Sequence, residues 1–173
     1  MVKSFNFAKK IYEKVMVMNL SISGMNEQLA TEILGWMYEA PYDFYNNSVT
    51  PEGIRELLDQ PYFAVHGEEG LLAGFFCVGE SAQVPAGTAF GAYEEGAVDI
   101  GIGMNPTLTG KGLGFAFFSL VLNHLQDNLP GMPFRLTVAS FNERAIRLYT
   151  KIGFDEKLRF QRGSIEFIVM SRE

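Results

Sequence analysis

The stretch VDIGIGMNPTLTGKGLG, residues 98–114, decides the fold of this chain. It begins with an apolar segment typical of a β-strand, passes through a turn that contains Pro106, and leads into an amphipathic helix expected over about residues 113–125. Three glycines within residues 110–114 lack a Cβ atom, so the backbone can turn tightly and expose its N–H groups. The first N–H groups of a helix have no partner inside it and lie at the positive end of its dipole. The segment therefore predicts a site for a phosphate-bearing ligand, to which Lys111 adds a positive charge.

Two other phosphate-binding loops do not fit this segment. A Walker A loop needs a serine or threonine directly after Gly-Lys, but Gly112 follows Lys111. The dinucleotide fingerprint G-x-G-x-x-G fails as well, because no pair of glycines two residues apart is followed by a third glycine three residues later.

The segment does resemble the acetyl-CoA diphosphate loop of the GNAT N-acetyltransferase family. That family's pattern is Gln/Arg-x-x-Gly-x-Gly/Ala, placed between its fourth strand and the helix that follows. Gly112 and Gly114 match the pattern, whereas Thr109 stands where Gln or Arg is usual. A second stretch, residues 138–154, resembles the family's next motif, N-x-x-A-x-x-x-Y-x-x-x-G-F, at every defined position, and it follows a strand-like segment at 134–138.

This resemblance implies an α/β (α+β) fold, in which a single three-layer domain has a central mixed, mostly antiparallel sheet flanked by helices. The domain would span residues 15–173, with residues 1–14 as a helical N-terminal appendage. Within the family, the second motif resembles the bacterial ribosomal-protein alanine acetyltransferase-like branch. The spacing of apolar and turn residues adds further elements. These are a strand at 15–22, helices at 27–37 and from 50, a hairpin of 62–65 with 71–78, a long loop or insertion at 79–96, and a closing hairpin of 154–160 with 164–170.

Composition limits the classes of function. A length of 173 residues with 47% apolar and 20% charged residues suits one globular domain. The net charge of −6 argues against a nucleic-acid partner, which would need concentrated Lys and Arg. The single cysteine, Cys77, is expected to be a buried and inert thiol, and no Cys/His cluster has metal-binding spacing, so no metal is expected. The sequence has neither an apolar run of about 20 residues nor a secretory signal, so we expect a cytoplasmic enzyme without a membrane partner. A homodimer stays open.

The resemblance places the donor, acetyl-CoA, along the fourth strand and the glycine loop. Glycines at 101 and 103 either leave one strand face bare for the acetyl group or mark a kink or bulge. The residues expected to bind the cofactor are Ile102, Gly103, Met104, Thr109, Gly110, Lys111, Gly112, Leu113, Gly114, Asn142 and Tyr149.

Two catalytic roles, a general acid and a general base, have candidate residues in the sequence. Tyr149 is the candidate general acid, because a phenol with a pKa near ~10 stays protonated at pH 7 and can protonate a departing thiolate. Alternatively, Tyr149 is an ordinary core tyrosine and Asn142 a helix cap. Asp99, with Glu94 or Glu95 just before it, is a candidate general base, and each of these is equally well a solvated surface acid.

The acceptor is expected over the sheet beside an aromatic segment formed by Trp36, Tyr38, Tyr42 and Tyr45. These rings form either a pocket wall or a satellite core. The sequence thus predicts transfer of an acetyl group from acetyl-CoA to a primary amine by direct attack in a ternary complex. The amine can be a small molecule or a peptide N-terminus. The alternative is a catalytically silent acyl-CoA-binding sensor or interaction module, in keeping with Thr109 and the lack of an obvious base.

Overall fold

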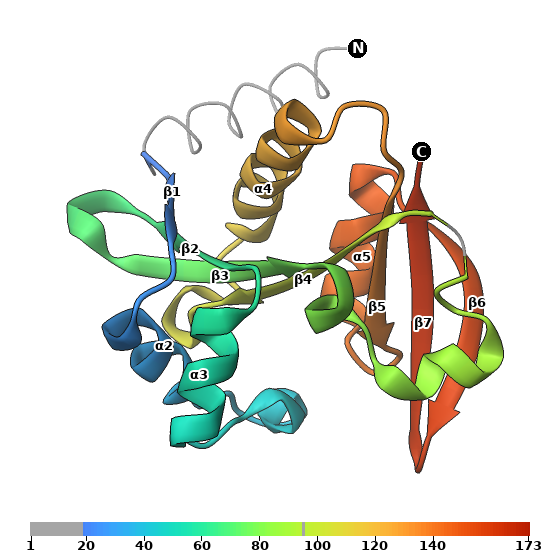
Figure 1. Cartoon of the computed structure of the whole chain (residues 1–173), viewed down its shortest axis with the longest axis horizontal. Helices are drawn as coiled ribbons and strands as arrows, with labels where there is room; N and C mark the ends of the chain where they lie inside the picture. Colours follow the sequence, from blue (N-terminus) through green and yellow to red (C-terminus); the bar gives the residue numbers. More distant parts are fainter. Residues whose placement is uncertain (1–18, 95) are drawn as a thin grey trace.

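The computed structural model describes residues 19–94 and 96–173, which form one seven-stranded sheet covered by helices on both faces (Figure 1). The strand order is β1-β2-β3-β4-β5-β7-β6. Neighbouring strands are antiparallel except β4 and β5, which run parallel. The strands are β1 (Ser21–Gly24), β2 (Tyr62–His66), β3 (Leu72–Val78), β4 (Val98–Met104), β5 (Phe134–Ala139), β6 (Asp155–Arg162) and β7 (Ile165–Arg172).

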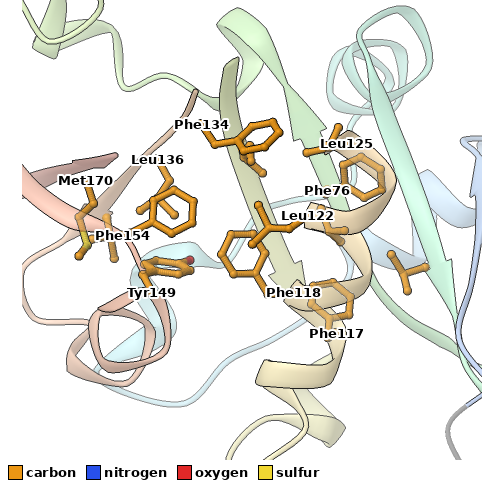
Figure 2. Packing of buried hydrophobic residues seen from close by; sticks show 14 of the residues in the cluster. Phe76, Phe117, Phe118, Leu122, Leu125, Phe134, Leu136, Tyr149, Phe154 and Met170 are labelled. Carbon is orange, nitrogen blue, oxygen red and sulfur yellow. The ribbon is translucent and has the colours of Figure 1, made fainter. Parts of the chain in front are cut away.

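Two pairs of α-helices cover opposite faces of the sheet. Helices α4 (Gly114–Asn128) and α5 (Glu143–Ile152) share an apolar cluster that contains Phe76, whereas α2 (Glu27–Leu34) and α3 (Pro51–Asp59) share one that includes its neighbour Phe75. Because successive side chains of a strand point to opposite faces, the two helix pairs lie on opposite sides of β3. Figure 2 shows the α4 and α5 side, where side chains of α4 meet those of β5, β7 and Tyr149. The three layers expected from the sequence are confirmed.

Residues 79–94 form an insertion whose apolar side chains pack against β5, β6 and β7. Its short 3₁₀ turns η3 (Gly79–Ala82) and η4 (Pro85–Phe90) lead to Tyr93, whose hydroxyl lies 3.0 Å from Thr137 Oγ1 on β5. Other 3₁₀ turns are η1 (Tyr42–Tyr45), η2 (Glu68–Gly70) and η5 (Pro106–Leu108). None of the helices within residues 19–94 and 96–173 is both long enough and apolar enough to cross a lipid bilayer.

Local signals in the sequence explain where the helices start and stop. The Asn26 side chain accepts a hydrogen bond from Leu29 N at 2.9 Å, so it is the N-cap of α2. Thr50 caps α3 in the same way, and Gly153, at φ +100°, ends α5. The helix expected to reach residue 37 ends at Leu34, and α4 extends to Asn128.

One prediction about the N-terminus reaches beyond the described part of the chain. Strand β1 overlaps the strand expected at 15–22 at residues 21 and 22, and it ends two residues later than expected. Residues 1–14, expected to be an appendage, and residues 15–18 lie outside the described residues.

Candidate active site

The parallel strands β4 and β5 separate after two residue pairs. Val98 lies opposite Phe134 and Asp99 opposite Arg135, and no later residue of β4 pairs with β5. Beyond this point β5 pairs only with β7, while β4 keeps its pairing with β3 up to Met104. The two strands therefore diverge (Figure 1), and the space between them, called the slot below, has the edge of β4 on one side.

The edge of β4 that faces the slot carries unpaired backbone groups. Val98 N donates to Pro133 O at 2.9 Å, so the N–H of Val98 points toward β5. Hydrogen-bonding direction alternates along a strand, and the backbone groups of Ile100, Ile102 and Met104 therefore point the same way. Beyond Asp99 no residue of β4 pairs with β5, and the backbone groups of Ile102 are therefore available to an extended ligand that would lie along this edge as an extra strand does.

Tyr38 closes the far end of this edge. Its hydroxyl donates a hydrogen bond of 2.8 Å to the carbonyl oxygen of Met104. Burial raises the pKa of Tyr38 to about 12, so the phenol keeps its proton and stays a donor at neutral pH. The backbone N–H and C=O of Ile102, midway along the edge, are left for a ligand.

Asp99 occupies the point where the two strands separate, and it is held there by a buried ion pair. Its carboxylate accepts from Arg135 Nε at 2.6 Å and from Arg135 Nη2 at 2.9 Å, and the Gln83 amide adds a third bond of 2.7 Å. The Asp99 and Arg135 side chains are only 4% and 7% exposed. Both carboxylate oxygens are therefore engaged, which fits a structural role for Asp99 better than the expected role of general base.

The glycine loop presents the start of α4 to the mouth of the slot. Gly110 and Gly112 have φ values of +73° and +72°, a region that residues with a Cβ rarely adopt. Helix α4 begins at Gly114, and Leu113 provides no side-chain cap. The N–H groups of the first turn therefore have no partner within the helix, as an anion site requires.

The slot and the loop line one cavity of about 550 Å³. Of the expected cofactor residues, Lys111 does not line it; those that do are Ile102, Gly103, Met104, Thr109, Gly110, Gly112, Leu113, Gly114, Asn142 and Tyr149. Of the expected acceptor residues, Tyr38, Tyr42 and Tyr45 line the cavity. One continuous space thus connects the glycine loop with the aromatic segment.

Tyr149 lies on the floor of the cavity, in contact with the main core. Its ring packs edge-on against Phe118, with ring centres 5.3 Å apart (Figure 2). Burial, and to a lesser degree the neighbouring Tyr45 hydroxyl, raises the pKa of Tyr149 well above its ordinary value. The Asn142 side chain joins this corner: its amide Nδ2 donates to Tyr45 Oη at 3.2 Å, and its Oδ1 caps α5 by accepting from Ala145 N.

Comparison with known proteins identifies the family of this chain. Residues 29–154 match the acetyltransferase (GNAT) family. The chain belongs to this family. Its match to the mycothiol acetyltransferase of Catenulispora acidiphila is 30% identical over 115 residues and covers 64% of this chain, but the chain spans only 35% of that relative's length.

Solved structures of low sequence identity share the GNAT fold. An acetyltransferase of the GNAT family from Bacillus anthracis is 16% identical with a TM-score of 0.67, covering 90% of this chain and 95% of its own. The yncA protein from Salmonella typhimurium, solved with acetyl-CoA as its cofactor, is 19% identical with a TM-score of 0.59, covering 89% and 93%. Neither comparison singles out the ribosomal-protein alanine acetyltransferase-like branch.

Within this GNAT domain, Trp36 does not reach the cavity. Its side chain is buried beside α2, and its ring centre lies 6.1 Å from that of Phe75. Phe75 in turn fills the space next to Gly103, where a Cβ would collide with the Phe75 ring. Trp36 therefore belongs to the apolar cluster of α2 and α3. Its position fits the satellite-core alternative better than that of a pocket wall.

The strand glycines make room for neighbouring side chains of the domain. A Cβ at Gly101 would lie 2.8 Å from Cys77 Sγ, and one at Gly103 would collide with Phe75. The face without Cβ atoms is thus filled by protein, and the expectation that it admits the acetyl group is not supported. Cys77 itself is buried, as expected, and burial raises its pKa to about 11, which keeps the thiol protonated and unreactive.

Sequence reasoning missed a row of basic residues on α5. Arg144, Arg147 and Lys151 line the cavity along the face of the helix next to the glycine loop. Their spacing of three and four residues places them on one side of a helix. That spacing is visible in the sequence, but only the packing of α5 against α4 brings it to the cavity.

No carboxylate or imidazole belongs to the cavity wall that the described residues form. Glu94 lies in the insertion, with its carboxyl group next to Gly91, and Glu95 lies outside the described residues. The described residues also contain no group of three or more His, Cys, Asp or Glu side chains that could hold a metal ion. A general base, if one acts, is therefore not among the side chains that line this cavity.

Proposed function

We propose that this chain transfers the acetyl group of acetyl-CoA to a primary amine, by direct attack of the amine on the thioester while both are bound. The observation that carries the proposal is the open edge of β4, which leads directly to the uncapped start of α4. A pantetheine arm with its amides needs the first, and a diphosphate needs the second. Membership in the GNAT family supports acetyl-CoA as the donor.

The donor would be held mainly by main-chain groups. The N–H groups around 110–114 would bind the diphosphate, and the N–H and C=O of Ile102 would bind an amide of the pantetheine arm. A preorganised N–H donor at the thioester oxygen is worth about 3 kcal/mol of barrier when charge develops there. Side chains of the loop contribute less to this arrangement than its backbone conformation.

Tyr149 is the proposed general acid, and its environment supports that role. The raised pKa of Tyr149 keeps the phenol protonated in the cavity. A thiolate that leaves within the same apolar surroundings is also destabilised, so its proton affinity rises together with that of the phenol. Asn142, 3.2 Å from Tyr45 Oη, would orient the arm or the phenols at this corner.

The amine would lose its proton without a carboxylate in the cavity wall. Within residues 19–94 and 96–173, no carboxylate of the cavity wall stabilises an ammonium group, and burial there disfavours the charged form, which lowers the pKa of the amine. We therefore propose that the acceptor enters as a neutral amine or gives its proton to water. The rate would then rise with pH until the bound amine is fully deprotonated.

The proposed acceptor is either a small amine or a peptide N-terminus. Tyr38, Tyr42 and Tyr45 form the wall on the acceptor side, and exposed acids near them, Glu39 and Asp43, would attract a cationic amine toward the entrance. A mixed panel of polyamines, amino acids, amino sugars and short peptides, followed by release of free CoA thiol, distinguishes these classes.

The test of the acid is Tyr149→Phe. We expect kcat to fall roughly 100- to 10,000-fold with little change in acetyl-CoA affinity, because only the proton donor is removed. Tyr62→Phe is the matched control, since Tyr62 lies on β2 outside the cavity wall. Unchanged turnover of Tyr149→Phe would remove Tyr149 from this role. Tight binding of acetyl-CoA without thiol release on any amine would favour the acyl-CoA-binding module, for which the missing base is the supporting observation.

A further inference from the structure

The guanidinium of Arg144 lies beside the glycine loop, at the mouth of the cavity. Arg144 is the second residue of α5, and its Cζ lies 4.1 Å from the centre of the Tyr42 ring. Its Nη1 lies 3.6 Å from the position that a Cβ at Gly110 would take. Arg144, Tyr42 and Gly110 all line the cavity. The charge thus stands next to the glycine loop that leads into α4.

The loop's own side chains do not place a charged donor in the cavity. Thr109 occupies the position where the resembling motif has Gln or Arg, and its hydroxyl already donates to Pro106 O at 2.9 Å. Lys111 is exposed and is absent from the cavity wall. A phosphate bound at this loop would therefore meet backbone N–H groups, while the cations that line the cavity come from α5.

We propose that Arg144 supplies this cation and binds the diphosphate of CoA, in place of the side chain that Thr109 lacks. The inference rests on the proposed function. The cation–π contact with Tyr42 uses none of the guanidinium N–H donors, so these donors stay available for two oxygens of a phosphate group. Tyr42, expected from the sequence to contact the acceptor, thereby holds a donor-side residue in place.

The electrostatic setting of Arg144 differs from that of its neighbour on α5. Arg147 Nη1 lies 3.2 Å from Glu143 Oε2, and this pair is largely exposed. Within the described part of the chain, no carboxylate lies within ion-pair distance of Arg144. Its charge is therefore not compensated by a partner that an incoming phosphate would have to displace.

The test measures binding of CoA, which cannot be turned over, to the full chain by titration calorimetry. We expect Arg144→Ala to weaken CoA binding roughly 10- to 100-fold, the range for a lost hydrogen bond between charged groups. The salt dependence of the dissociation constant should also become shallower, since fewer ionic contacts remain. Arg55→Ala, which removes an exposed arginine from α3, is the matched control and should change neither value.

A rescue variant separates phosphate binding from a purely structural role. Thr109→Arg in the Arg144→Ala background restores a cation at the loop, so most of the lost affinity should return. Melting temperatures of all variants show whether any of them has lost its fold. If Arg144 only stabilised η1 by packing on Tyr42, Thr109→Arg would raise the affinity by the same factor in the unmodified chain and in Arg144→Ala, and that result would overturn the inference.

Dephospho-CoA, which lacks the 3′-phosphate but keeps the diphosphate, identifies the group that Arg144 contacts. The same loss of affinity for CoA and dephospho-CoA in Arg144→Ala supports the diphosphate assignment. A loss seen only with CoA overturns that assignment, because the contact would then be with the 3′-phosphate. Unaltered affinity in Arg144→Ala rejects the inference and leaves the proposed function standing, whereas failure of the unmodified chain to bind CoA rejects both.

Discussion

The donor side of the cavity is built mainly from main-chain groups, whereas the acceptor side is built from side chains. On the donor side, the edge of β4 and the start of α4 present N–H and C=O groups whose positions follow from backbone conformation. On the acceptor side, the rings of Tyr38, Tyr42 and Tyr45 shape the wall. Under the proposed function, main-chain groups set by the fold would hold the donor, whereas the choice of acceptor would depend on a few side chains in one short segment.

The two sides meet in two contacts. The Tyr38 hydroxyl bonds the carbonyl of Met104 on β4, and the Tyr42 ring carries the guanidinium of Arg144 beside the glycine loop. Each contact joins an aromatic residue of the acceptor segment to a donor-side element. Substitutions in the acceptor segment will therefore leave donor affinity unchanged only where they spare these contacts.

The largest expected effect tests whether the donor-side backbone depends on one buried pair. Asp99→Ala removes the carboxylate to which the buried Arg135 donates two hydrogen bonds, so we expect the free energy of unfolding in urea to fall by about 3–5 kcal/mol. Replacing both partners with apolar residues, Asp99→Leu with Arg135→Met, should recover much of this loss. A cost below about 1 kcal/mol for Asp99→Ala would show that the ion pair does not hold the point where β4 and β5 separate.

The glycine loop gives a second test, at the level of ligand binding. Gly112→Ala forces a Cβ into a backbone with φ +72°, which costs about 1–2 kcal/mol, and any relaxation moves the N–H groups of the loop. We expect acetyl-CoA to bind roughly 5- to 30-fold more weakly, measured by calorimetry. Gly131→Ala is the matched control, since Gly131 has φ +76° with open space around it and lies outside the cavity wall. It should lower stability by a similar amount and leave affinity intact; equal loss of affinity in both variants would mean that strain alone is responsible.

The donor side can be predicted from the sequence because its requirements appear as residue identities. Closely spaced glycines followed by an apolar helix are local signals, and they are enough to locate the loop within residues 110–114, where two of the glycines adopt positive φ. The order of the elements follows in the same way from caps, turns and apolar spacing. Gly153, for example, ends α5 where the motif requires a glycine.

Roles that depend on contacts across the sheet cannot be predicted in this way. Asp99 has the chemistry of a general base, and only the strand register shows that Arg135, distant in sequence, lies opposite it. From the sequence, the glycines at 101 and 103 fit either a bare strand face or a kink. Only the structure shows that Cys77 and Phe75 of the adjacent strand fill the space beside them. The role proposed for Arg144 could not be predicted for the same reason, because Arg144 comes close to Gly110 only when α5 packs beside the loop.

The smallest expected effect at neutral pH is the contribution of a buried tyrosine, Tyr38, to the pH dependence of stability. Folding raises the pKa of Tyr38 from 10.0 to about 12 through burial, so the folded chain holds this proton more tightly than the unfolded chain does. Its contribution to stability is therefore complete below pH 10 and is lost as the pH rises through about 12. Chemical unfolding at pH 8, 10 and 11 should show falling stability, and Tyr38→Phe should show a shallower fall because it carries no titrating group. An equally steep fall in Tyr38→Phe would assign the alkaline sensitivity to the other tyrosines whose pKa values burial raises, which are Tyr45, Tyr62 and Tyr149.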